Sequence, residues 1–269
     1  MATTHNLNNI VVDRVLRGIF SDKEDNIIFS LNQVQNLSIN STSESQEVLD
    51  ALGVSIMELM RSKAIEVSAE NAIYDFGLLS AQYGTEKTTA SSTAKITVPT
   101  METFEVPATG NTVNLAHLPT DIADIKKIYA LNGDSTLGEA YEVATTATEG
   151  KFSISESEGK AVVTIPAGVT AGTELFVMYE YESENAIELI NKANEFAKMG
   201  KMTFECLVYD VCDPETKIFA YLILPRFQLS NDFDWSIGGD SQTHAFGGKA
   251  HVDYCSKDKQ MLRVVVVDD

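Results

Sequence analysis

Short runs of apolar and β-branched residues, separated by Gly, Asn, Asp, Ser and Pro, make up most of this sequence. Such runs between turn-forming residues are typical of strands, and few segments are long enough for a convincing helix. The sequence therefore predicts a mostly β fold. In the first part of the chain it predicts strands at 26–31, 34–39 and 62–68, whereas the mixed segment 48–60 fits neither period.

The clearest helix is predicted directly afterwards, over residues 68–82. Ser68 is a suitable N-cap, Glu70 lies in the first turn, where negative charge suits the helix dipole, and Gly84 follows the end. Apolar side chains recur near helical spacing at Ala69, Ala72, Ile73, Phe76 and Leu79. A stripe of this kind usually packs on a sheet, so we expect a core helix with no function of its own.

The composition changes at Gly84. Residues 85–94 are rich in Thr, Ser and Ala, like a linker, and short strands with frequent turns then run to Tyr181. We predict an inserted small β-sandwich domain, Ig-like in architecture, over residues 93–185, although the Cys pair and core Trp of a true immunoglobulin domain are missing. Its strands are predicted at 96–98, 112–115, 127–131, 161–165 and 174–181, with turns at Asn132-Gly133, Glu158-Gly159 and Ala171-Gly172.

Residues 1–92 and 186–269 then form a discontinuous host domain. Segment 186–198 fits a helix or a strand equally well, because periodicity alone does not decide between them. The remainder again predicts strands, at 202–209, 218–224, 227–235, 243–254 and 261–267, with a turn at 213–216.

Composition adds few constraints. With 44% hydrophobic and 22% charged residues in 269, the chain is expected to fold without disulfides. No apolar run approaches the roughly 20 residues that span a bilayer, and the polar segment 1–9 does not resemble a signal peptide. Three cysteines are an odd number, which favours reduced thiols in a cytosol over a disulfide framework.

The net charge of −19 is the extreme value of this chain. An acidic protein repels phosphate backbones, so ordinary nucleic-acid binding is disfavoured. Such a charge serves solubility. It also suits a surface that DNA must pass without adhering.

Each candidate for a binding or catalytic site lacks part of the residue pattern that its chemistry requires. No phosphate-binding glycine motif occurs, and the pairs Gly238-Gly239 and Gly247-Gly248 are interpreted as turns. Asp232 and Asp234 share one face of a predicted strand, but such pairs arise by chance among 39 acidic residues.

The sequence gives equally little support to a metal site or a catalytic thiol. His244, His251 and Cys255 lie close in sequence and Cys212 upstream, but their spacing does not match the common zinc patterns. Cys206 and Cys212 lie in apolar strand or turn segments, and no GxSxG motif occurs. The sequence therefore predicts no catalytic, cofactor-binding or metal-binding residue, and we expect a protein that is not an enzyme.

Two regions carry a resemblance to a known family. The first comprises EVLDALG at 47–53 and RSKAIEVSAENAIYDFGLLSAQYG at 61–84. The second comprises LILPRFQLSNDFD at 222–234, THAF at 243–246 and DYC at 253–255. Together they resemble the major tail tube proteins of long-tailed bacteriophages, and the matches lie in the two segments that flank the insert.

The resemblance implies a β-sandwich or barrel domain with one helix that assembles into hexameric rings. The rings would stack, with other tail proteins, into the conduit through which the phage genome leaves the virion. Made in the host cytoplasm, such a protein would need no cofactor or membrane, and phage DNA would pass its lumen without specific binding. We expect carboxylates to outnumber Lys and Arg on the lumen wall.

Other interpretations remain open. A capsid decoration or baseplate protein would use the same small sandwich. A carbohydrate-binding module is disfavoured because Trp235 is the only Trp and leaves little aromatic surface. A hydrolase using Asp232 and Asp234 ranks last.

Overall fold

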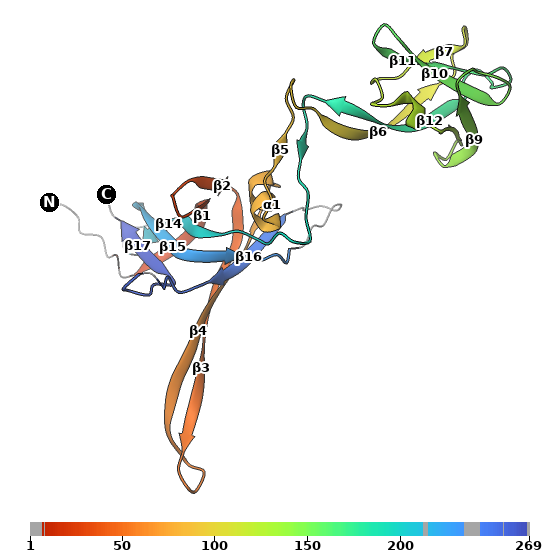
Figure 1. Cartoon of the computed structure of the whole chain (residues 1–269). Helices are drawn as coiled ribbons and strands as arrows, with labels where there is room; N and C mark the ends of the chain where they lie inside the picture. Colours follow the sequence, from red (N-terminus) through yellow and green to blue (C-terminus); the bar gives the residue numbers. More distant parts are fainter. Residues whose placement is uncertain (1–6, 8, 212–214, 234–242, 255, 268–269) are drawn as a thin grey trace. The chain divides into compact units, whose positions relative to one another are not determined.

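The computed structural model describes residues 7, 9–211, 215–233, 243–254 and 256–267 (Figure 1). Within this part of the chain the protein is mostly β with one α-helix, as the sequence predicts. The chain divides into two compact units. Unit 1 comprises Met1–Lys87 and Leu189–Asp269, and unit 2 comprises Thr88–Glu188, compared with sequence-based boundaries of 93 and 185.

Unit 1 is built on one eight-stranded antiparallel sheet. Its order is β2-β1-β14-β15-β16-β4-β3, and β17 pairs with β15 beside β16. The strands are β1 (Ile10–Ser21), β2 (Ile27–Leu31), β3 (Val34–Leu49), β4 (Ser55–Asn71), β14 (Met199–Asp210), β15 (Lys217–Leu229), β16 (His244–Ala250) and β17 (Arg263–Val267).

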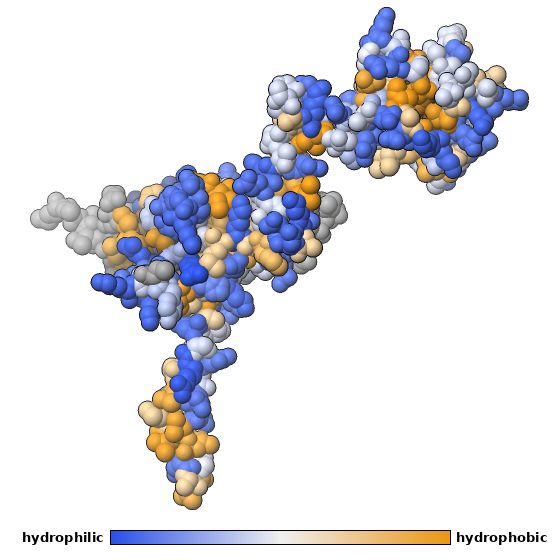
Figure 2. Space-filling view, viewed as in Figure 1, coloured by the Kyte–Doolittle hydropathy of each residue, from blue (hydrophilic) through white to orange (hydrophobic). Residues whose placement is uncertain are grey.

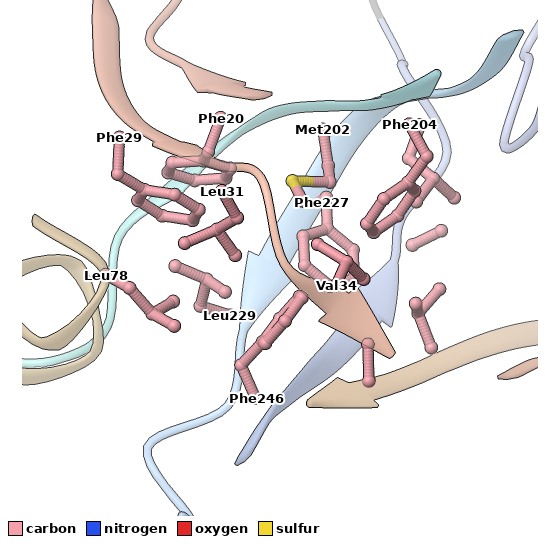
Figure 3. Close-up of a cluster of buried hydrophobic side chains, with 14 of the residues drawn as sticks. Phe20, Phe29, Leu31, Val34, Leu78, Met202, Phe204, Phe227, Leu229 and Phe246 are labelled. Atoms are coloured by element: carbon pink, nitrogen blue, oxygen red, sulfur yellow. The ribbon is translucent and has the colours of Figure 1, made fainter. Parts of the chain in front are cut away.

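One face of this sheet encloses the core of unit 1. Alternate residues of β14 are buried there because successive side chains of a strand point to opposite faces. The sheet curls, so that residues of β2 and β4 pack in the same cluster as those of β14 and β15. Figure 3 shows its centre, formed by Phe20, Phe29, Leu31, Val34, Leu78, Met202, Phe204, Phe227, Leu229 and Phe246.

The helix begins later than the sequence predicts. Ser68 is not an N-cap, because β4 continues to Asn71 and Ser68 pairs there with Gly247 of β16. The helix α1 is Phe76–Tyr83, capped by Asp75, whose Oδ1 accepts a hydrogen bond from the amide of Leu78 at 2.7 Å. Gly84 ends it in the left-handed conformation, where a Cβ would approach the carbonyl oxygen of Phe196.

Two further local predictions are wrong. Gly247 and Gly248 lie inside β16 rather than in a turn, because they pair with Ser68 and Val67 of β4. Glycine is required at 248, since a Cβ there would lie 2.1 Å from the carbonyl oxygen of Gln228. The predicted break at Pro225 is absent, and β15 runs through it. Pro225 is tolerated because the β14–β15 register shifts at this point.

Unit 2 contains a seven-stranded sheet in the order β6-β12-β8-β9-β10-β11-β7. All seven strands are hydrogen-bonded in series and enclose a separate core centred on Ile128, Phe152, Val163 and Leu175. The elements are β6 (Ile96–Glu105), β7 (Thr112–Asn114), the 3₁₀ turn η1 (Ile122–Asp124), β8 (Lys127–Leu131), β9 (Leu137–Ala144), β10 (Lys151–Ser157), β11 (Lys160–Thr164) and β12 (Glu174–Ser183).

The two chain segments at the boundary of unit 2 pair with each other. β5 (Thr88–Thr89) and β13 (Ile187–Glu188) form a two-stranded antiparallel ladder. The ladder continues with a hydrogen bond from the amide of Ala90 to the carbonyl of Ala186. Segment 186–198 is therefore strand only at 187–188, and no helix forms there.

Candidate assembly surfaces

The strands β1 and β17 of unit 1 have backbone groups along one side that pair with no described strand. β2 pairs only with residues 18–21 of β1, so residues 10–17 pair with β14 alone. At the other end, β17 pairs with β15 alone among the described strands. The four strands β1, β14, β15 and β17 therefore form a sheet, here called the wall sheet, whose two outer strands expose unpaired backbone groups.

The wall sheet alternates in direction from strand to strand, so β1 and β17 are antiparallel to each other. The outer strands are also apolar where they are exposed, with Val264 56%, Val11 54% and Val12 60% accessible. β17 carries neither Pro nor a bulge, the usual protection of an edge strand. The pairing of β1 with β14 shifts twice, between Val12 and Arg14 and between Val15 and Arg17, which adds twist.

One face of the wall sheet packs on the core, and the other is turned away from it. The outward residues follow from the register, because directly paired residues share a face. Arg17 lies opposite Glu205, which lies opposite Tyr221. The Tyr221 hydroxyl donates a hydrogen bond to Glu205 Oε1 at 3.2 Å. Across this face the outward side chains are Val11, Arg14, Arg17, Ile19, Lys201, Thr203, Glu205, Leu207, Tyr209, Lys217, Phe219, Tyr221, Ile223, Arg263, Val265 and Val267.

The β3–β4 hairpin is the second exposed surface. β16 pairs with β4 only over Ile65–Asn71, so residues 40–64, here called the distal hairpin, have no partner strand besides each other (Figure 1). None of these residues is buried. Two strands alone are at best marginally stable in water, so this segment lacks the support that the rest of the sheet has.

The end of the distal hairpin is apolar, as Figure 2 shows. Leu52 is 87% exposed, Met60 68% and Ile56 65%. In β4, Ile56 and Met60 point to one face and Met57 and Leu59 to the other, so both faces are apolar. A contiguous exposed patch of this kind marks an interaction surface.

A buried polar cluster fixes α1 against the sheet. His244 Nε2 lies 2.8 Å from Gln82 Oε1, and His244 Nδ1 accepts a hydrogen bond from the amide of Asp75 at 3.4 Å. Gln82 Nε2 in turn donates to the carbonyl of Ala245 at 3.2 Å. Burial lowers the pKa of His244, and the Asp75 carboxylate opposes this shift. These contacts give His244, considered above for a metal, the role of anchoring the helix.

The other candidate residues do not form a reactive cluster in the described part of the chain. His251 is exposed beyond the end of β16, and seven extended residues separate it from His244 by roughly 23 Å. Cys206 is buried, which raises the pKa of its thiol. Asp234, Trp235, Gly238-Gly239, Cys212 and Cys255 lie outside the described residues.

Asp232 is exposed and lines a groove of about 1110 Å³ on the outer side of β3, β4 and β16. The carboxylates beside it already have partners: Glu66 forms an ion pair with Lys249 at 2.9 Å, and Glu70 accepts a hydrogen bond from Asn36 at 3.3 Å. Across the described residues, no three His, Cys, Asp or Glu side chains gather as metal ligands. Nor does any described helix have the length and apolar character needed to cross a membrane.

Comparison of the sequence with models of protein families identifies the family of this chain. The family model described as the YomU/Tube protein family matches residues 10–264, which includes both units. The chain belongs to the YomU/Tube protein family. No protein matches in a search of curated sequences. Membership supports a tube-like structural protein of phage origin, in agreement with the tail-tube resemblance.

Proposed function

We propose that this YomU/Tube protein is the structural subunit of a phage tail tube. Six copies form a ring, and rings stack, together with other tail proteins, into the conduit through which the genome leaves the virion. The subunit is made in the host cytoplasm and performs no catalysis, with no cofactor. The function is to build a closed and rigid channel.

The open edges of the wall sheet carry this proposal. When a second copy places its β1 beside β17 of the first, the added strand runs antiparallel, as at every other position of the wall sheet. Repeating this contact continues the sheet, and closure into a barrel removes both exposed edges. The contact is head to tail, because each copy contributes a different strand, and such contacts generate rings.

The distal hairpin provides the contact between rings. A stable two-stranded segment requires burial of an apolar face, and the exposed side chains at Leu52, Ile56 and Met60 provide one. Burying them on a neighbouring ring stabilises the contact by roughly 25 cal/mol per Å² of apolar surface. A ring subunit with edges for lateral closure and a hairpin for axial stacking forms a tube.

The lateral contact is tested by adding a charge to the open edge. We expect Val264→Lys to leave the subunit folded but prevent ring closure, because a Lys at an edge strand disfavours pairing. Light scattering measures the oligomer mass, and negative-stain imaging shows rings or tubes. Leu137→Lys is the matched control, since Leu137 is 55% exposed and belongs to β9 of unit 2 rather than to either edge strand of the wall sheet.

The proposal predicts rings or tubes for the unmodified chain and for Leu137→Lys, but dispersed subunits for Val264→Lys. A chain that stays monomeric at high concentration, alone and with its tail partners, contradicts the proposal. A monomer that instead binds a preformed capsid or baseplate supports a decoration or baseplate protein.

A further inference from the structure

The face of the wall sheet that lines a closed ring follows from where the rest of unit 1 lies. The core face is covered by the curled half of the sheet and by α1, whose Leu78 and Ala81 pack in the core cluster. Such layers add about 10 Å for a packed sheet and about 10 Å for a helix.

A ring of six wall sheets has 24 strands. At the usual strand spacing and tilt, its radius is roughly 24 Å. Six copies of the curled half and helix, directed inward, would fill that space and leave no channel. In such a ring, the outward face of the wall sheet is therefore the face that lines the lumen.

The charge on that face is opposite in sign to that of the chain. Among the described residues of the four strands, its cations are Arg14, Arg17, Lys201, Lys217 and Arg263, and all five are exposed. Lys201 forms an ion pair with Asp25 of the β1–β2 turn at 3.3 Å. The carboxylates are Glu205, which lies opposite Arg17, and Asp13, in the bulge beside Arg14. Five cations and two carboxylates give this face of the four strands a net charge of +3 in a protein with a net charge of −19.

The acidic residues are concentrated elsewhere. Unit 2 contains five Lys and no Arg against 15 Asp and Glu, so it holds more than half of the net negative charge. The charges on the outward face of the wall sheet differ in their neighbours. Arg17, Glu205 and Tyr221 form a row across three strands, so Arg17 faces a carboxylate. Lys217 and Arg263 have no carboxylate directly opposite on this face.

We propose that the outward face of the wall sheet contacts the phosphate backbone of duplex DNA through Arg14, Arg17, Lys217 and Arg263. This inference rests on the proposed tube function for its geometry, and it reverses the expectation of an acidic lumen that the net charge suggested. A few cations in each copy, set among neutral side chains such as Thr203, Phe219 and Val265, bind DNA weakly and without regard to sequence.

The experiment measures binding of a fluorescein-labelled 20-bp duplex to the full-length chain by fluorescence anisotropy over a range of salt concentrations. The face variant carries Arg14→Gln, Arg17→Gln and Arg263→Gln. A control variant with the same net charge carries Lys23→Gln, Lys127→Gln and Lys160→Gln, which are exposed positions that do not belong to the strands of the wall sheet. A third variant carries Arg→Lys at the three face positions and retains their charge.

We expect the unmodified chain, the control and the Arg→Lys variant to bind DNA at low salt. In the face variant, the slope of log affinity against log salt should fall by about two to three, because each lost phosphate contact removes about 0.9. Circular dichroism checks that each variant is folded. Absence of salt-dependent binding by the unmodified chain, or an equal loss in the control, overturns the inference.

Imaging of the same proteins separates this inference from the tube function. Tubes without DNA binding leave the function standing and overturn the charge assignment. DNA binding that depends on the three Arg residues, in a chain that forms no rings, supports the assignment of this face and contradicts the tube.

Discussion

Unit 2 and the distal hairpin use apolar residues in opposite ways. Unit 2 encloses twelve buried residues in a core of its own, including Phe152 and Leu175, which are fully buried. The distal hairpin has comparable apolar side chains at its end but buries none of them. Unit 2 buries its apolar residues within a single copy, whereas the distal hairpin leaves its own exposed.

The difference also appears at the edges. The edge strand β6 of unit 2 contains Pro99, which blocks a backbone donor and protects the edge from pairing. β17 of unit 1 reads Arg-Val-Val-Val-Val and has no such protection. The edge strand β17 is therefore the one of the two that can pair with a further strand.

The largest expected effect follows from polar substitutions on the distal hairpin. Leu52→Ser, Ile56→Ser and Met60→Ser together should abolish tubes, since the proposed contact between rings buries these three exposed side chains. The stability of the isolated subunit should change by less than about 0.5 kcal/mol per site, as is usual on a surface. Sedimentation and negative-stain imaging measure assembly, and chemical denaturation measures stability.

The control for this triple variant removes similar apolar side chains from unit 2, through Met101→Ser, Leu137→Ser and Met178→Ser. All three positions are more than half exposed. Tubes should persist. Loss of tubes in the control as well would show that the comparison between the two regions is wrong.

A cavity in the core of unit 2 should have the next largest effect. Phe152→Ala removes a fully buried ring and is expected to cost about 3–5 kcal/mol. Only the calorimetric transition of unit 2 should shift, because its core is separate from that of unit 1. Phe204→Ala is the matched variant in unit 1. If either substitution lowered both transitions equally, the two units would not be independent.

A smaller effect concerns the stability of unit 1 at acidic pH. Burial lowers the pKa of His244 in the folded chain, so the unfolded chain binds a proton more readily. Stability should therefore be complete above the unfolded value of about 6.5 and fall as the pH drops below it, with the loss complete below the folded pKa. Denaturant titrations between pH 7.5 and 4.5 measure the slope.

His244→Gln should flatten this dependence, whereas His251→Gln should not, because His251 is exposed. The same flattening in both variants would assign the dependence to another group.

The smallest expected effect is that of removing most of unit 2. Replacing residues 93–185 by a short Gly/Ser turn keeps the β5–β13 ladder and all of unit 1. Because the core of unit 1 contains no residue of unit 2, folding and tube formation should be nearly unchanged. Circular dichroism and imaging provide the measurement. An unfolded product would show that unit 1 depends on its insert.

The predicted strands agree with the structure where a single periodicity prevails, as at 26–31, 127–131 and 161–165. The helix start failed because local signals at Ser68 compete with a strand partner more than 170 residues away in sequence, Gly247 of β16. The sequence pattern of segment 48–60 fitted neither helix nor strand for another reason. Strand periodicity reports one buried face, and the distal hairpin presents apolar side chains on both faces.

The assembly surfaces could be inferred from sequence only in outline. The resemblance implied rings, but it could not identify the open edges, because these depend on which strands β1 and β17 lack as neighbours. The sign of the outward face was also inaccessible. A shift of register by one residue would exchange Arg17 and Lys217 with core positions, and the total charge of −19 indicates nothing about individual faces.

The β5–β13 ladder has a consequence for how this chain can change in evolution. The chain leaves unit 1 after Lys87 and returns before Leu189 on two hydrogen-bonded strands, so the two ends of the intervening segment are held about 5 Å apart. Any self-contained domain with adjacent termini fits that gap without altering the sheet of the host. Replacement of the whole insert by another such domain is accordingly a change that leaves the sheet of unit 1 intact.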